Sequence, residues 1–387
     1  MLNLFSLIIN SKFQLGAIMQ RLKSIDNFRA ITMVMMIWIH LRLWWLRDAD
    51  QWFVDITLPF TDRVFACAFL IIAGASATLF TRSRIIKTNN MENYSLKMAK
   101  NEYYLRALFI FILAIGYNSF VALLFMNPLI IWKWFLLLTT AVSLMLIWPL
   151  LSISKIYRII LAIILWITNY YLFSFLSHFQ GDSNVFGFLY YFLYHSLDQD
   201  PIFFTFSFFI IGSVLGDVIF EINLIKNQEK RTFRLKYGML YPLIIIGLFL
   251  VIIGLIYEYP YYNNDHNFSW IAFPLGFNLI LFAILIVLEE FKIWSIKTNF
   301  RYLYYFSFYS LTVFIAHNVL YFLFYRLLDL INIWVFILVT LLLCGILLHL
   351  IFNSRWRQYA SIKLQLGKIA KGLVDKKGIK GNENDLK

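Results

Sequence analysis

Charged residues are scarce in this chain. They make up 14% of its 387 residues, whereas hydrophobic residues make up 61% and the mean hydropathy is +0.72. A soluble core cannot bury that much apolar surface, so the composition excludes an ordinary soluble domain and indicates that the lipid bilayer is the main solvent. Aromatic residues reach 19%, which suits the aromatic belts found at membrane interfaces.

Acidic residues and cysteines are scarcer still. The 21 Asp and Glu are outnumbered by 34 Lys and Arg, which gives a net charge of +13. We reject nucleic acid as a partner, because the basic residues fall in loops between apolar runs, where they act as topology signals. The two cysteines, Cys67 and Cys344, lie in different apolar runs, so a disulfide framework is not indicated.

Several familiar motifs are missing. The sequence has no zinc-ligand spacing, no Walker loop and no nucleophile elbow, and its six histidines are scattered, so we expect no metal. It has no internal repeat of helix pattern, which leaves an inverted-repeat transporter without support. Residues 1–20 lack the charged start and the cleavage site of a signal peptide, so we expect a peripheral N-terminal segment.

The sequence does contain a series of apolar runs near the length of a transmembrane helix. We predict an all-α, polytopic bundle in a membrane domain of residues 21–354, followed by a basic, disordered cytoplasmic tail of residues 355–387. A shorter apolar segment, 186–196, is expected to be interfacial or re-entrant. The ten predicted spans are 27–46, 58–80, 104–126, 129–151, 156–177, 201–222, 239–257, 269–289, 303–326 and 330–352.

The positions of the basic residues support ten spans. If the N-terminus is cytoplasmic, all but five of the 34 Lys and Arg fall on the cytoplasmic side. The exceptions are Arg42, Arg47, Arg63, Lys133 and Arg326. This strict alternation predicts that both termini are cytoplasmic.

The first predicted span carries titratable groups along one face. Arg29 and His40 are eleven residues apart, about three helical turns and about 16 Å, and Asp26 shares their face. Such groups are costly in lipid and usually face a cavity or a partner. The pair Asp26 and Arg29 fits either a functional ion pair or a boundary salt bridge, and His40 fits either an acid–base catalyst or a structural histidine.

Two further polar positions fall in the outer halves of other spans. Asp62 lies near the outer end of the second span, where it either orients an imidazole or pairs with the neighbouring Arg63. His317 lies in the ninth span at about the depth of His40, and Ser310 is seven residues before it on the same face.

Four sequence blocks together resemble a known family. Arg29, ten residues and then His40 match the R-x10-H pattern of membrane-bound acyltransferases, and "SIDNFRAITMVMMIWIH" resembles the first helix of the heparan-α-glucosaminide N-acetyltransferase-like branch, related to the acyltransferase 3 family. Ala30 replaces that branch's usual glycine. "CAFLIIAGASATLF", "FFTFSFFIIGSVLGDVI" and "FYSLTVFIAHNVL" resemble later helices, with Phe314 in a tyrosine position, and all four blocks occur in order over about residues 21–320.

The resemblance implies an enzyme that moves an acyl group, usually acetyl, from cytosolic acetyl-CoA to a sugar or glycan on the opposite side of the bilayer. It implies that His40 is a general base or an acyl carrier, that Asp62 orients it, and that His317 is a second acid–base group or an oxyanion donor.

Basic residues are expected to bind the acetyl-CoA donor. Arg29, fixed by Asp26, is expected to help hold the CoA end of the donor. The basic inner loops add three arginines suited to its phosphates, Arg82, Arg84 and Arg106.

The sequence leaves several alternatives open. A multi-pass transporter or lipid-linked-sugar flippase would use the same histidines as a proton relay. Base catalysis serves amine and hydroxyl acceptors alike, and the oligomeric state, monomer or homodimer, is not determined. The membrane would be the plasma membrane in a prokaryote and a lysosomal membrane or another endomembrane in a eukaryote.

Overall fold

The fold is a bundle of helices. The computed structural model describes residues 23–90, 94–194, 200–258, 268–290 and 301–384, which are helical apart from turns and one isolated β-bridge between Leu46 and Leu328. Helices satisfy their own backbone hydrogen bonds, as lipid requires. The α-helices are α2 (Lys23–Trp45), α3 (Trp52–Thr57), α4 (Asp62–Asn90), α5 (Leu96–Leu124), α6 (Leu136–Leu150), α7 (Lys155–Ser177), α8 (Val185–Leu193), α9 (Ile202–Asn223), α10 (Gln228–Leu235), α11 (Tyr241–Glu258), α12 (Ser269–Glu290), α13 (Tyr302–Phe308), α14 (Ser310–Ala316), α15 (Asn332–Asn353) and α16 (Ile362–Asn384).

The ten predicted spans all fall on helices. Within the described residues, eight helices are long and apolar enough to cross a bilayer, and a bent pair of helices near the C-terminus would make a ninth. The remaining predicted span is α2, which has 23 residues but carries several charged or titratable groups. The all-α polytopic architecture is therefore confirmed, while the direction in which the bundle crosses the membrane stays a prediction.

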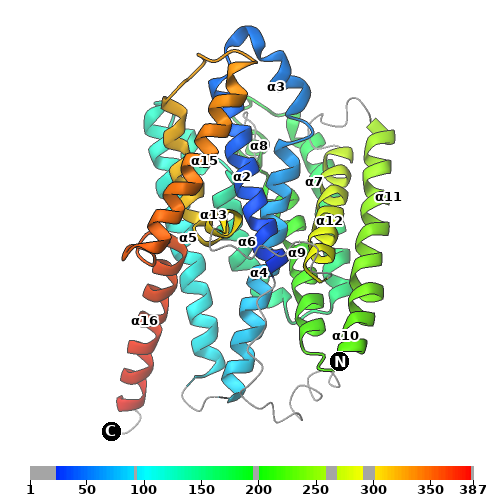
Figure 1. Ribbon diagram of the computed structural model, residues 1–387, viewed down its shortest axis with the longest axis vertical. Helices are drawn as coiled ribbons and strands as arrows, with labels where there is room; N and C mark the ends of the chain where they lie inside the picture. The colour runs from blue at the N-terminus through cyan, green and yellow to red at the C-terminus, as the bar shows by residue number, and fades with distance from the viewer. Residues whose placement is uncertain (1–22, 91–93, 195–199, 259–267, 291–300, 385–387) are drawn as a thin grey trace.

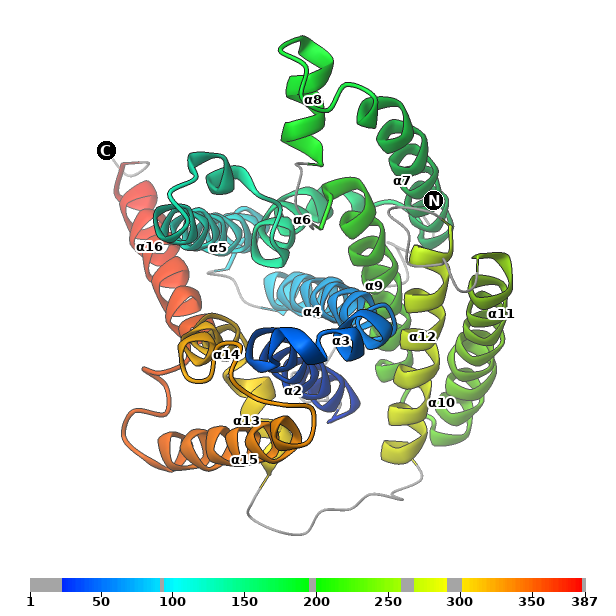
Figure 2. The same ribbon diagram turned by 90° about the horizontal axis from the view of Figure 1, so that it is seen from above.

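Helix α2 lies near the centre of the bundle (Figure 2), where it packs against α4, α12, α13 and α15. Its neighbours shield its polar groups from lipid, which explains how a helix of modest apolarity lies inside a membrane protein. The N-terminus of α2 is held by Glu289 of α12, whose carboxylate accepts the backbone N–H groups of Lys23 (2.8 Å) and Ser24 (2.6 Å). A carboxylate there also complements the positive end of the helix dipole.

Small residues let α4 and α9 approach each other closely. A Cβ atom on Gly74 would overlap the carbonyl of Phe209, and one on Gly212 would overlap the carbonyl of Ile71. Close backbone contact of this kind is how membrane helices gain packing energy in the absence of a hydrophobic driving force. This contact joins α9 to α4, and α4 packs in turn against α2 in the centre of the bundle.

The ninth predicted span is wrong as a continuous helix. The segment Tyr302–Phe308 and the segment Ser310–Phe322 meet at an angle of 82°. After α14 the chain tightens into the 3-10 helix η4, which spans His317–Phe322. His317 therefore stands at the first residue of a distorted turn, whereas the sequence pattern predicted a position inside a regular α-helix.

Helices next to three of the predicted inner segments lie toward one end of the bundle. The end of α4, the start of α5, helix α10 and helix α16 lie toward this end, and α3 lies at the other end (Figure 1). The predicted disordered tail is wrong over Ile362–Asn384, because the structure forms α16 there and packs it against α5. The short segment predicted over 186–196 is the nine-residue helix α8, and the peripheral segment 1–20 lies outside the described residues.

Candidate active site

Two histidines far apart in the sequence meet inside the bundle. The Nδ1 atom of His40 on α2 lies 2.8 Å from the Nε2 atom of His317 on η4. Their rings are nearly parallel, with centroids 4.9 Å apart and an interplanar angle of 9°. Both residues were predicted from the sequence as candidate site residues, and the structure brings them into direct contact.

Hydrogen-bond accounting assigns the protons of this pair. The Nδ1 atom of His317 faces the carbonyl of Val313 at 3.3 Å, and a carbonyl can only accept, so Nδ1 carries the hydrogen. In a neutral His317 the Nε2 atom then holds a lone pair and accepts the hydrogen bond from Nδ1–H of His40. This leaves the lone pair of His40 on its Nε2 atom, the nitrogen that a base or a nucleophile needs.

The two histidines differ in how deeply they are buried. His317 is buried, with 5% of its surface exposed, and both of its ring nitrogens are occupied. His40 is only half-buried, and its Nε2 atom makes no hydrogen bond with the described residues. His40 is therefore the member of the pair that can contact a substrate, and the oxyanion-donor role predicted for His317 would require it to give up one of these hydrogen bonds.

Aromatic residues close one side of the pair. Trp44 stacks on His40, with centroids 5.0 Å apart and an angle of 12°, and also lies parallel to His317. Tyr321 packs edge-on against Trp44. Trp44 lies one helical turn after His40 on the same face of α2, a spacing that marks it as a neighbour of the imidazole, yet the sequence analysis did not single it out.

The polar groups predicted near the start of α2 also form a cluster. Arg29 donates to Asp26 (3.3 Å), to Ser307 of α13 (3.3 Å) and to Ser76 of α4 (2.5 Å). Ser307 donates in turn to Asp26 at 3.1 Å. The predicted ion pair of Asp26 and Arg29 is thus present, and it ties three helices together about three turns along α2 from His40.

Asp62 does not occupy the orienting position predicted for it. The hydrogen-bond partner of His40 Nδ1 is His317, and the Asp62 carboxylate lies 3.8 Å from the guanidinium of Arg63. Asp62 also interacts electrostatically with Arg42, whose guanidinium donates to Thr57 and Thr61. The carboxylate thus interacts with Arg63 of α4 and with Arg42 of α2, and its predicted role toward His40 stays a prediction.

Arg84 and Arg106, both predicted to bind the donor, share one buried carboxylate. Arg84 lies 2.8 Å and Arg106 3.5 Å from the same oxygen of Glu102. The hydroxyl of Tyr94 donates to the other oxygen at 2.8 Å, and burial together with this hydrogen bond raises the pKa of Tyr94 to about 12. Sequence reasoning missed Glu102, because a lone glutamate near a helix start reads as an exposed charge.

Arg82 is likewise paired with a carboxylate. It donates to both oxygens of Asp217 on α9, at 2.7 and 3.1 Å, and to the carbonyl of Leu151 at 2.9 Å. Arg158, which is buried, also pairs with Asp217. In both clusters two guanidinium groups share one carboxylate, so each keeps a net positive charge at the end of the bundle where the basic residues gather.

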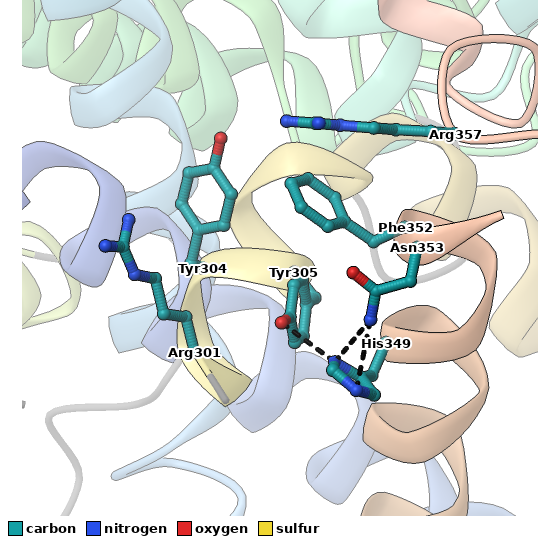
Figure 3. Close-up of a pocket in the computed structure, with 7 residues that line it drawn as sticks. All are labelled: Arg301, Tyr304, Tyr305, His349, Phe352, Asn353 and Arg357. Carbon is teal, nitrogen blue, oxygen red and sulfur yellow. Dashed lines mark hydrogen bonds between the residues drawn. The ribbon is translucent and has the colours of Figure 1, made fainter. Parts of the chain in front are cut away.

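A cavity of about 590 Å³ opens on another side of α13, and the sequence analysis did not predict it. Figure 3 shows the side chains that line it. They come from α13, from α15 and from the turns that flank them, namely Arg301, Tyr304, Tyr305, His349, Phe352, Asn353 and Arg357. A metal centre is not evident in the described part of the chain, where no three His, Cys, Asp or Glu side chains lie close enough together to hold an ion.

Comparison with known proteins gives a family match that covers the part of the site on α2 and α4. The model of a family described as heparan-alpha-glucosaminide N-acetyltransferase, catalytic, matches residues 21–258. The match covers more than half of the chain and includes Asp26, Arg29, His40 and Asp62, but it ends before His317. Among curated proteins, no match was found.

Proposed function

The chain belongs to the heparan-alpha-glucosaminide N-acetyltransferase catalytic family, a family of membrane acetyltransferases, and we propose that it moves an acetyl group from cytosolic acetyl-CoA to a sugar or glycan on the opposite side of the membrane. The observation that carries the proposal is the lone pair on His40 Nε2, which the hydrogen bond to His317 leaves free. The acceptor is an amino or a hydroxyl group, because the same base serves both.

The chemical step uses His40 as the general base. The acceptor nitrogen or oxygen attacks the thioester carbonyl carbon, and the bond between that carbon and the CoA sulfur breaks. The proton of the acceptor goes to Nε2 of His40 and then to the departing CoA sulfur, so the histidine ends the cycle neutral. His317 positions His40 throughout, since its lone pair holds the Nδ1–H group of the base.

A covalent route uses the same nitrogen. Nε2 of His40 would attack the thioester carbonyl carbon, the bond to the CoA sulfur would break, and CoA would leave as its thiolate while the ring carries the acetyl group as an acyl-imidazolium. The acceptor would then attack the acetyl carbon, the bond to Nε2 would break, and the proton of the acceptor would pass to the CoA thiolate. The two routes differ in one observable, because only the covalent route leaves acetyl on the protein when no acceptor is present.

The donor would approach from the end of the bundle that carries the basic residues. The shared-carboxylate clusters around Glu102 and Asp217 keep net positive charge there, which favours the CoA phosphates. The thioester arm would then extend along α2 past Arg29, and the eleven residues from Arg29 to His40 correspond to about 16 Å. This length separates the anionic end of the donor from the acyl group at His40.

The test is a transfer assay on the purified protein. Acetyl-labelled CoA is supplied with glucosamine or with neutral sugars, and a parallel reaction without acceptor is examined by intact-protein mass measurement. Label in the sugar supports the proposal, the type of sugar separates amine from hydroxyl acceptors, and acetyl on the protein alone identifies the covalent route. Absence of transfer together with absence of thermal stabilisation by acetyl-CoA would overturn the proposal, because a bound donor must raise stability by mass action.

A further inference from the structure

The cavity beside α13 carries two arginines, Arg301 and Arg357. Within the described residues, neither Arg301 nor Arg357 forms an ion pair, in contrast to Arg82, Arg84 and Arg106, each of which is paired with a buried carboxylate. Both guanidinium groups line a space of about 590 Å³, a volume typical of a small-molecule site. Two unneutralised cations in one cavity create a site for an anion.

The guanidinium of Arg357 is held in place by stacking. It lies over the ring of Phe352, 3.8 Å from the ring centroid, so its N–H edge remains available for oxygen ligands. Figure 3 shows Arg357 on one side of Tyr304 and Arg301 on the other side. A ligand with several acceptor oxygens, such as a phospholipid headgroup, would bring negative charge and hydrogen-bond acceptors into the cavity that the two arginines line.

The rest of the lining is polar and already ordered. The hydroxyl of Tyr305 lies 2.8 Å from Nδ1 of His349, and the side-chain amide of Asn353 lies 3.1 Å from Nε2 of the same ring. Tyr305 is buried, so this group of side chains is fixed before a ligand arrives. It supplies neutral hydrogen-bonding groups beside the two charges.

The surroundings of the cavity indicate a ligand with apolar chains. Along α15 the side chains of Leu338, Leu342 and Ile346 are exposed, and their spacing places them on the same helix face as His349 of the cavity lining. The exposed aromatic residues just beyond α15, Trp356 and Tyr359, are the types that mark a membrane interface. An apolar face that ends in a basic cavity at such an interface suits a phospholipid, with its chains along α15 and its headgroup in the cavity.

The acetyl donor is a poorer fit to this cavity. Tyr304 and Tyr305 of α13 line the cavity, whereas Ser307 of the same short helix bonds to Arg29 and Asp26. The cavity and the polar cluster that leads along α2 to His40 therefore use different side chains of α13.

We propose that the cavity between α13 and α15 binds the phosphate headgroup of an anionic phospholipid, with Arg301 and Arg357 as the ligating cations. Basic pockets between membrane helices on the cytoplasmic side are recognised sites for such headgroups. This site lies outside the residues that match the family model, and its occupancy is independent of the acetyl-transfer chemistry.

The test measures lipid retention on the full-length protein. Three proteins are compared: wild type, the double variant Arg301→Gln/Arg357→Gln and the control Arg355→Gln. Each is reconstituted in nanodiscs of phosphatidylcholine, alone or mixed with phosphatidylglycerol. The protein is then extracted, and its mass is measured together with the lipids that remain bound. Arg355 is a good control, because it is exposed in the same turn but does not line the cavity. We expect selective retention of phosphatidylglycerol by wild type and by the control, and about fivefold weaker binding for each cavity arginine removed.

Each result has a defined meaning. Equal retention of phosphatidylglycerol by the double variant would overturn the proposal, as would an equal loss in Arg355→Gln, which would show only general surface attraction. Thermal unfolding in phosphatidylcholine verifies that the double variant is folded. If acetyl-CoA stabilises wild type but not the double variant, while lipid retention is unchanged, the cavity belongs to the donor and the lipid assignment is wrong.

Discussion

His40 and His317 are joined by a 2.8 Å hydrogen bond between Nδ1 of the first and Nε2 of the second, although 277 residues separate them in the chain. The contact fixes which nitrogen of each ring carries a proton. It also assigns different tasks to the two rings, because one is buried with both nitrogens occupied and the other presents a free lone pair. Amide substitutions can imitate one ring nitrogen at a time, and this makes the assignment testable.

The variant His40→Asn tests the catalytic role of His40 separately from its structural role. The asparagine amide can replace the Nδ1–H group and keep the hydrogen bond to His317, but it has no counterpart of Nε2. We expect the acetyl-transfer rate to fall by about 10²–10⁴-fold, the usual contribution of general acid–base catalysis, with little change in the melting temperature. Rapid transfer by a folded His40→Asn protein would contradict the assignment of the base.

The two amide variants of His317 are predicted to differ. In His317→Gln the side-chain oxygen can accept from Nδ1–H of His40, as Nε2 does now, so much of the activity should remain. In His317→Asn the amide takes the place of Nδ1, the acceptor is lost, and the turnover number should fall about tenfold or more, although less than in the His40 variant.

The readout for His317 is the turnover number together with its pH profile. A positioning defect lowers the turnover number without raising the KM for the sugar. It also alters the acidic side of the pH–rate profile, where the base must lose its proton before it can act. Equal loss in the glutamine and asparagine variants would show that the ring itself, and not its acceptor, is needed.

Much of the site could be predicted from local spacing along one helix. The eleven-residue interval from Arg29 to His40 is set by helix geometry, so placing both on one face of α2 required no tertiary information. The shared depth of His40 and His317 followed from counting residues from the ends of their spans. The ion pair of Asp26 and Arg29 is a contact within one helical turn.

The features that the sequence did not predict depend on partners distant in the chain. Pairing of Asp62 with its neighbour Arg63 was one of the alternatives predicted, but its interaction with Arg42 of another helix was not, and Glu102 is buried where two arginines surround it. The break in the ninth span occurs with neither proline nor glycine between Tyr302 and Phe322 to signal it. The helical tail gains its stability from packing on α5, which composition alone cannot reveal.

Arg29→Gln tests the donor side of the site. The change removes a charge that donates to Asp26, Ser307 and Ser76 and that lies on the expected path of the thioester arm. We expect the KM for acetyl-CoA to rise about tenfold or more, since a hydrogen bond to a charged group contributes about 1.5–3 kcal/mol, while the KM for the sugar changes little. Ser76→Ala, which removes one partner of Arg29 and no charge, is the control, and a larger effect on the sugar KM would reassign Arg29 to the acceptor.

Glu102→Gln should destabilise the protein strongly. The glutamate is buried and pairs with both Arg84 and Arg106, and breaking a buried ion pair by removing one partner costs about 3–5 kcal/mol. Tyr94→Phe removes only the hydroxyl that donates to Glu102, so we expect a loss of about 1 kcal/mol. Thermal unfolding in one detergent ranks the variants, and similar melting temperatures for both would mean that the carboxylate contributes no more than its hydrogen bond to Tyr94.

Gly212→Ala tests whether close contact between α4 and α9 holds the centre of the bundle. An added Cβ would overlap the backbone carbonyl of Ile71, which cannot move aside as a flexible side chain could, so the helices must separate at a cost of about 1–3 kcal/mol. Gly116→Ala is the matched control on α5, because its Cβ would meet nothing within 4 Å and alanine favours the helix by about 0.5–1 kcal/mol. We therefore expect a lower melting temperature for Gly212→Ala and an unchanged or higher one for Gly116→Ala. Because α4 packs against α2, the same separation should also reduce the transfer rate, and a Gly212→Ala protein with wild-type stability would show that the two helices do not need this contact.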